Sequence, residues 1–130
     1  MQTYKKIENY LSNVRNQSFQ WGVKDCALFA NDMLVEVFGM PDVGEKFRGK
    51  YTTKLGSAKI IKSLKYKDVQ DIADVRLTPT TKPKDGDIAL HEYSLGIVYR
   101  SQAYFLQEDT GLFKIWEGKC SKFWRYVPCS

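Results

Sequence analysis

The chain has no stretch approaching the ~18 apolar residues that a membrane-spanning helix needs. Its amino terminus, MQTYKKIENYLSNV, also contains no apolar run of the kind found in a signal peptide. These two absences exclude an integral membrane protein with a helical span and argue against secretion by a cleaved leader. We therefore expect a chain that is synthesised in the cytoplasm without a signal peptide.

Histidine and cysteine are scarce. His91 is the only histidine, and the three cysteines, Cys26, Cys120 and Cys129, show no spacing typical of a metal site. An odd number of cysteines in a chain without a leader also argues against a disulfide framework. The sequence thus predicts no metal and no cofactor.

The charge is moderately basic, with 20 lysines and arginines against 15 acidic residues and a net charge of +5. The lysines are scattered in ones and twos, without a dense stripe or a base-stacking motif, so we expect no nucleic-acid partner. We interpret the surplus as a solvated surface. The alternative is attraction to an acidic polymer such as teichoic acid or to an anionic membrane surface.

Helical periodicity dominates the first half. Apolar residues recur at helical spacing in residues 4–14 and again in 57–64. The strongest signal lies between them: Asp25 is a good N-cap, residues 26–38 are apolar nearly all round, and Gly39 supplies a stop. A helix this apolar is expected to be buried at the centre of the fold.

The intervening and following segments have weaker patterns. Residues 40–55 have poor periodicity and are interpreted as an ordered loop, and residues 65–85 as a connector that ends in a stretch rich in proline and lysine.

From residue 87 onwards the hydrophobic period changes to two. Helices followed by strands predict an α+β fold, with the N-terminal helices packed on a C-terminal antiparallel meander. No repeat or second domain is evident, so we expect residues 1–130 to form a single domain. The five candidate strands cover residues 87–91, 95–100, 103–107, 112–116 and 123–127.

Cys26 occupies the predicted first turn of the central helix. There a thiol lies near free backbone N–H groups and the positive end of the helix dipole, which favours a nucleophilic thiolate. The same N–H groups can stabilise an oxyanion. The alternative for a lone cysteine is a structural role in the interior.

Around Cys26 the sequence acquires a specific resemblance. WGVKDCALFANDML, followed by GDIALHEYSLGIVYR, resembles the NlpC family of bacterial and phage cell-wall peptidases. A phage and prophage branch of that superfamily is a closer match. Further motifs in the same order extend this resemblance from about residue 19 to residue 125: Phe47-Arg48-Gly49-Lys50-Tyr51, Gly86-Asp87, Leu95-Gly96-Ile97, Gly111-Leu112 and Trp124-Arg125.

The resemblance implies a papain-like, NlpC-type domain with Cys26 as nucleophile. In the active peptidases a histidine precedes the strand that here begins Leu95-Gly96-Ile97, and this chain has Ser94 in that position. A serine hydroxyl has no suitable pKa for a general base near neutral pH. If Glu92 and Tyr93 form a two-residue turn, His91 pairs with Ser94 and could act as a substitute base. The alternative is an exposed hairpin histidine.

The resemblance also suggests roles for other polar residues. Gln107 falls near the position of the residue that orients the imidazole, although a polar strand end explains it equally well. Arg48 either binds a peptide carboxylate or clamps its own loop by hydrogen bonds to carbonyls. The candidate substrate-binding residues are Trp21, Asp25, Arg48, Tyr51 and Ser94.

Three functions follow as hypotheses. The first is a phage tail protein, at the tail tip or in tail assembly, that keeps the fold with weak or absent catalysis; its partners are other tail proteins and its location is the virion. The second is an active cysteine endopeptidase that cleaves peptidoglycan peptides during infection. The third is an intracellular binding module unrelated to phage.

Overall fold

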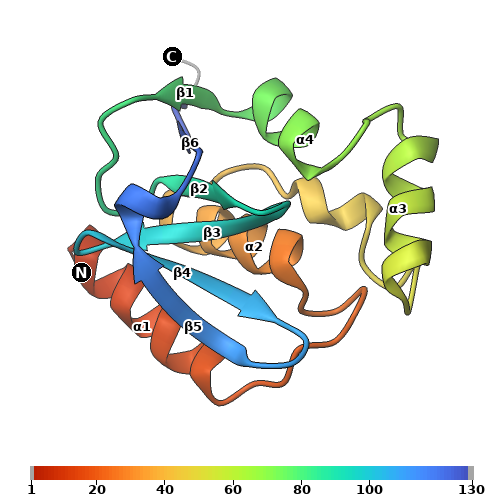
Figure 1. Ribbon diagram of the computed structural model, residues 1–130, viewed down its shortest axis with the longest axis horizontal. Helices are drawn as coiled ribbons and strands as arrows, with labels where there is room; N and C mark the ends of the chain where they lie inside the picture. Colours follow the sequence, from red (N-terminus) through yellow and green to blue (C-terminus); the bar gives the residue numbers. More distant parts are fainter. Residues whose placement is uncertain (1, 129–130) are drawn as a thin grey trace.

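The computed structural model describes residues 2–128, and within them four α-helices stand against one antiparallel sheet (Figure 1). This arrangement confirms the predicted α+β class. Helix α1 (Thr3–Arg15) buries the apolar face that its periodicity predicted, with Ile7, Leu11 and Val14 in the interior. No helix in this part of the chain is long and apolar enough to cross a membrane.

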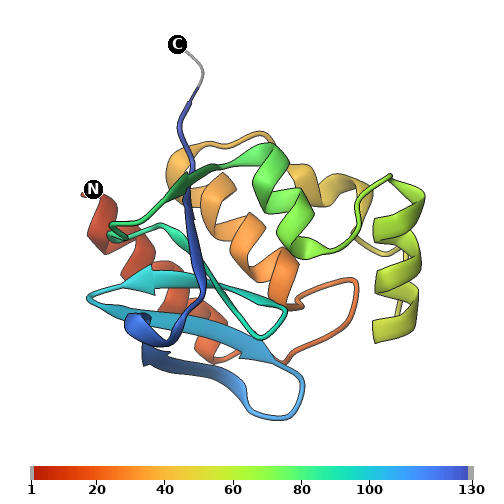
Figure 2. The same ribbon diagram turned by 45° about the horizontal axis from the view of Figure 1, so that its top comes forward.

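Helix α2 (Cys26–Phe38) is the central element, as its composition predicted. The Asp25 side chain caps its first turn by accepting a hydrogen bond from the Leu28 N–H, and Gly39 ends it in the left-handed conformation, with φ of 72°. One side of α2 packs on strand β3 (Ser94–Tyr99) and on α1. Helix α4 (Val69–Arg76), green in Figure 2, also contacts β3 and shares the apolar core on the α2 side of the sheet.

The prediction that residues 65–85 form a connector is wrong. They contain helix α4 (Val69–Arg76) and the short strand β1 (Thr78–Thr80). Helix α4 has eight residues and buries only Ala73 fully, so its apolar pattern is too faint to stand out; the Asp68 cap was the local signal. Helix α3 (Lys54–Ser63) begins three residues before the predicted third helix. The expected loop before it includes the 3₁₀ turn η1 (Val43–Lys46).

The sheet has the strand order β1-β6-β2-β3-β4-β5, with every pair antiparallel. Four consecutive strands form the predicted meander, but the last strand does not extend it. After β5 the chain turns through η2 (Glu117–Lys119) and returns to the opposite edge, where β6 pairs with both β1 and β2. The strands of this second half are β2 (Ile88–His91), β3 (Ser94–Tyr99), β4 (Gln102–Gln107), β5 (Gly111–Trp116) and β6 (Lys122–Arg125).

Candidate functional site

Asp25 is a buried carboxylate that joins three segments at the start of α2. Only 1% of its surface is exposed. One carboxylate oxygen accepts from the Leu28 N–H at 3.0 Å, and the other accepts from the Gly22 N–H at 3.1 Å and the Tyr51 hydroxyl at 2.5 Å. Both carboxylate oxygens are thus hydrogen-bonded within this chain. These bonds hold the segment before α2 and the loop that contains Tyr51 against the start of the helix.

The Trp-Gly pair before the helix has a steric explanation. Gly22 has φ of 79°, and a β-carbon there would overlap the carbonyl oxygen of Tyr51. The Gly22 carbonyl in turn accepts a hydrogen bond from the Gly49 N–H at 2.8 Å. The loop around Tyr51 and the segment before α2 therefore pack backbone against backbone, and only a glycine at position 22 permits so short a distance.

Cys26 is the first residue of α2, as predicted, and its thiol is closely surrounded by protein. Burial, and secondarily the neighbouring Asp25 carboxylate, raise the pKa of the Cys26 thiol to about 11, against the lowering effect of hydrogen bonds from the Leu95 backbone and the Ser94 hydroxyl. The helix N-terminus alone would favour a thiolate. At this site desolvation outweighs it, so the resting form near neutral pH is the thiol.

Ser94 and His91 are opposite residues of a tight hairpin, as the change in period predicted. Glu92 and Tyr93 form the two-residue turn with φ of 48° and 66°, and His91 pairs with Ser94 at the end of the β2–β3 ladder. Their side chains accordingly share one face of the sheet.

The two residues have different neighbours. Ser94 contacts the Cys26 thiol. The His91 ring lies 6.0 Å from that of Phe105, and its Nδ1 is 3.3 Å from the Lys119 carbonyl oxygen. Within residues 2–128 no hydrogen bond or ring contact joins His91 to Cys26.

Gln107 completes this small polar group. Its side-chain amide donates to the Ser94 hydroxyl at 3.3 Å. The predicted strand β4 therefore supplies a polar neighbour for Ser94. Within residues 2–128 no hydrogen bond joins Gln107 to the His91 imidazole. The structure brings Cys26, Ser94 and Gln107 together, and the catalytic roles proposed for Cys26, His91 and Gln107 stay predictions.

Trp21 lies beside this group at the surface. Its indole N–H donates to the Glu108 carboxylate at 3.0 Å, and its ring meets Phe19 edge-on, with centroids 4.8 Å apart. Glu108 follows Gln107 at the end of β4, so this bond ties the loop before α2 to the β4–β5 turn. The sequence offered no signal for Glu108 as the partner.

Arg48 is held by two carboxylates of this chain. Its guanidinium donates two hydrogen bonds to Asp32, at 2.6 and 3.1 Å, and further bonds to Asp42 at 3.0 and 3.1 Å. These bonds raise the pKa of Arg48, and the Arg48 and Lys24 side chains lower that of Asp32 against the opposing effect of burial. These contacts hold the loop as the clamp alternative expected, but the acceptors are side-chain carboxylates and not carbonyls.

The Gly-Asp and Trp-Arg motifs meet at the other end of the sheet. Arg125 makes a two-pronged contact with the buried Asp87 carboxylate, at 2.7 and 2.9 Å. The Trp124 indole donates to Asp74 at 2.9 Å. Both bonds join β6 to elements that precede the meander, so these motif residues serve the sheet and lie outside the Cys26 group.

Taken as chemistry, the Cys26 group has a thiol and helix N–H donors; its side-chain neighbours Ser94 and Gln107 are neutral, and the adjacent Asp25 carboxylate disfavours a thiolate. No cluster of three or more histidine, cysteine or acidic side chains suited to a metal ion occurs among residues 2–128. Cys26 and Cys120 are free thiols, and Cys129 lies outside the described residues.

The chain belongs to the DUF6950 family, described as a domain of unknown function, whose model matches residues 2–126. That match covers almost the whole chain, including Cys26, Ser94 and Arg125. None of the curated proteins matches the chain.

Proposed function

We propose that this DUF6950 member is a structural protein of a phage tail, at the tail tip or in tail assembly, with a papain-like, NlpC-type fold whose cysteine site does not cleave peptides. The tail assignment rests on the motifs shared with the phage branch. The loss of catalysis rests on one observation: Ser94, whose hydroxyl neighbours the buried Cys26 thiol, occupies the position where the peptidases carry a histidine.

Two requirements of a cysteine peptidase are poorly met at this site. With a pKa of about 11, the Cys26 thiol is almost entirely protonated at pH 7. A proton donor for the leaving amine is also lacking among the described side chains that neighbour the thiol, and such general acid–base help contributes about 10²–10⁴-fold to the rate. Neither Ser94 nor Gln107 can supply that proton near neutral pH.

An active cysteine endopeptidase is the second candidate, and one observation favours it. His91 stands directly opposite Ser94 across the hairpin, on the same face of the sheet. A rotation of its side chain away from Phe105 would bring the imidazole closer to the space beside Ser94. Peptidoglycan would then be the substrate, with Cys26 as nucleophile.

The test of catalysis compares the chain with three variants on purified peptidoglycan. We expect equal background release of new amino termini from the unaltered chain, Cys26→Ala, His91→Ala and the control Cys120→Ala. Release that Cys26→Ala and His91→Ala both abolish, and Cys120→Ala does not, would establish the enzyme instead.

A gain-of-function variant sharpens this test. Ser94→His places an imidazole next to Cys26, and an imidazolium there favours the thiolate. We expect the pH profile of Cys26 alkylation to shift to lower pH in Ser94→His, with Cys120→Ala as the background for both proteins. An unchanged profile would contradict the inferred contact between residues 94 and 26.

The tail assignment has its own test, mass spectrometry of purified virions from a phage or induced prophage that encodes this chain. We expect the chain at a fixed ratio to the tail proteins. Its consistent absence from intact particles would overturn the assignment, whatever the outcome of the peptidoglycan assay.

A further inference from the structure

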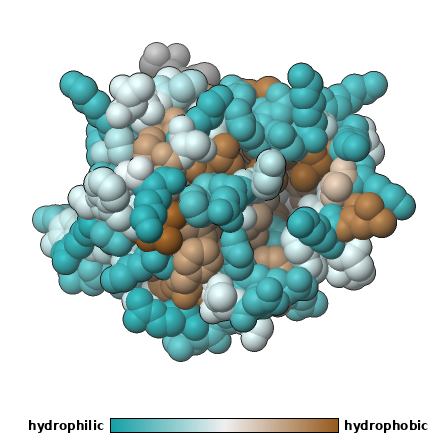
Figure 3. All heavy atoms as spheres, viewed as in Figure 1, coloured by the Kyte–Doolittle hydropathy of each residue, from teal (hydrophilic) through white to brown (hydrophobic). Residues whose placement is uncertain are grey.

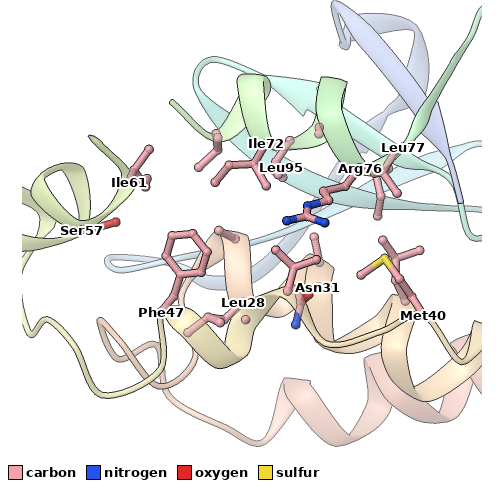
Figure 4. A pocket seen from close by; sticks show the side chains of 18 of the residues that line it. Leu28, Asn31, Met40, Phe47, Ser57, Ile61, Ile72, Arg76, Leu77 and Leu95 are labelled. Atoms are coloured by element: carbon pink, nitrogen blue, oxygen red, sulfur yellow. The ribbon is translucent and has the colours of Figure 1, made fainter. Parts of the chain in front are cut away.

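An apolar cavity lies between α2, α4 and strands β2 and β3 of the sheet, and Cys26 is not among the residues that line it. Its volume is about 70 Å³, and its wall is formed by α2, η1, α3 and α4 together with Ile88 of β2 and Leu95 of β3 (Figure 4). Apolar side chains form almost all of its wall, among them Leu28, Met40, Phe47, Ile72 and Leu77. In the space-filling view, hydrophobic residues are visible between α3 and α4, as they are at some other places on this face (Figure 3).

The size of the cavity limits its occupant. A water molecule needs roughly 10–15 Å³ on the same measure. The cavity thus accommodates about five such units, comparable to the branched side chain of leucine or a short alkyl chain. A long acyl chain would not fit.

A cation stands beside this apolar space. The Arg76 guanidinium extends from α4 across the cavity (Figure 4). Its one recorded hydrogen bond goes to the Tyr66 hydroxyl at 3.2 Å, and no carboxylate in the described part of the chain forms an ion pair with it. Arg48 and Arg125, by contrast, are both held by carboxylates.

The wall also contains a polar atom without a partner. The Asn31 amide nitrogen donates to Asp32 at 3.0 Å and to Asp42 at 2.8 Å, which fixes the orientation of the side chain. Its oxygen is buried and finds no donor within residues 2–128. Because an unsatisfied buried acceptor is costly, a ligand that supplies an N–H would be favoured at Asn31.

We propose that this cavity binds an apolar amino acid with a free carboxylate and an acylated amine. The side chain fills the cavity, the carboxylate pairs with Arg76, and the amide N–H donates to the Asn31 oxygen. Two sources share this chemistry: the C-terminal residue of a peptide, and a free N-acyl amino acid. The inference does not depend on whether Cys26 cleaves peptides.

The experiment is a titration of the ¹⁵N-labelled full chain, followed by NMR, with N-acetyl-leucine. For a ligand of this size we expect a Kd of about 0.1–1 mM, with shifts concentrated at Asn31, Ala73 and Arg76. N-acetyl-leucinamide lacks the carboxylate and 4-methylpentanoate lacks the N–H, so each is expected to bind at least about fivefold more weakly. A short peptide ending in leucine separates the sources: tighter binding than N-acetyl-leucine indicates a peptide terminus, and weaker binding a free N-acyl amino acid.

Two variants keep the proposal falsifiable. Arg76→Gln removes the cation from an exposed position and is expected to weaken binding of N-acetyl-leucine by about tenfold or more, whereas the control Arg15→Gln binds as the unaltered chain does. Ala73→Leu fills the cavity and should abolish binding. No localised shifts with any of these ligands at 10 mM (about ten times the weakest expected Kd), or equal affinity of Arg76→Gln and the unaltered chain, would overturn it.

Discussion

Asp25 and Asp87 are both buried carboxylates that precede a helix or strand, with 1% and 2% of their surface exposed. The negative charge of each is compensated in a different way. Asp25, before α2, accepts only from neutral donors: two backbone N–H groups and the Tyr51 hydroxyl. Asp87, before β2, is paired with the Arg125 guanidinium and also accepts from the Lys84 N–H.

The difference follows from what each carboxylate precedes. The N-terminus of α2 carries a partial positive charge, which helps to stabilise an anion at Asp25 without a cation nearby. A strand has little net dipole, so Asp87 needs the guanidinium that β6 supplies. Both carboxylates are thus structural anchors, one local to the start of α2 and one that spans the sheet.

The largest expected effect is at the uncharged anchor. Asp25→Ala leaves the Tyr51 hydroxyl and two backbone N–H groups without their acceptor, and we expect the free energy of unfolding to fall by about 3–5 kcal/mol. Urea unfolding followed by circular dichroism measures this loss.

The matched control is Asp68→Ala, which removes the exposed N-cap of α4 and should cost about 1 kcal/mol. If both substitutions cost the same, the buried hydrogen bonds of Asp25 contribute nothing beyond an ordinary cap.

The charged anchor should respond less, because part of Arg125 faces solvent. Arg125→Met leaves the Asp87 carboxylate with a single backbone donor, and we expect a loss of about 2–3 kcal/mol. The double variant with Asp87→Asn should lose less than the sum of the two single changes, since neither partner is then left charged and alone. Additive losses in thermal or urea unfolding would refute the coupling. Arg15→Met, at an exposed arginine of α1, is the reference.

Much of this fold could be predicted because its strongest signals are local. The Asp25 cap, the apolar run and Gly39 define α2 within 15 residues, and alternation with a tight turn at Glu92-Tyr93 defines the hairpin. Helix α4 and β1 escaped prediction because they are short and depend on neighbours. The partner of β6 escaped because the contact between Asp87 and Arg125 joins positions 38 residues apart.

The candidate site was predictable to a similar extent. Cys26 at the helix start and the pairing of His91 with Ser94 followed from the local pattern. The acidic partners of Arg48 did not, because Asp32 lies inside an apolar helical run and Asp42 in a segment without periodicity. Whether a thiol is activated or suppressed depends on how much protein surrounds it, and that is a property of packing.

A smaller change probes the neutral donors of the Asp25 anchor. Tyr51→Phe removes only the hydroxyl that donates to the Asp25 carboxylate, and we expect a loss of about 1.5–2 kcal/mol, as for a hydrogen bond to a charged group. Tyr93→Phe, at the exposed hairpin turn, should change the free energy of unfolding by less than about 0.5 kcal/mol. A loss for Tyr51→Phe no larger than this would mean that Asp25 is held by the backbone donors alone.

The smallest effect concerns the thiol beside Asp25. The pKa of Cys26 is raised from an ordinary value of 9.0 to about 11, so its contribution to stability is complete below pH 9 and is lost as the pH rises through 11. The pKa values of Tyr10 and Tyr51 are raised as well, and their ionisation destabilises the fold at still higher pH. Cys26→Ser keeps both tyrosines and removes only the titrating thiol.

The stability of the unaltered chain relative to Cys26→Ser should therefore fall by about 1 kcal/mol between pH 8 and pH 10. Urea unfolding at intervals of half a pH unit measures the difference. In an Asp25→Asn background the fall should be smaller, because the Asp25 charge is one cause of the raised thiol pKa. A difference that stays flat across this range would mean that the Cys26 thiol is solvated like a free cysteine. Burial would then not suppress Cys26 as a nucleophile.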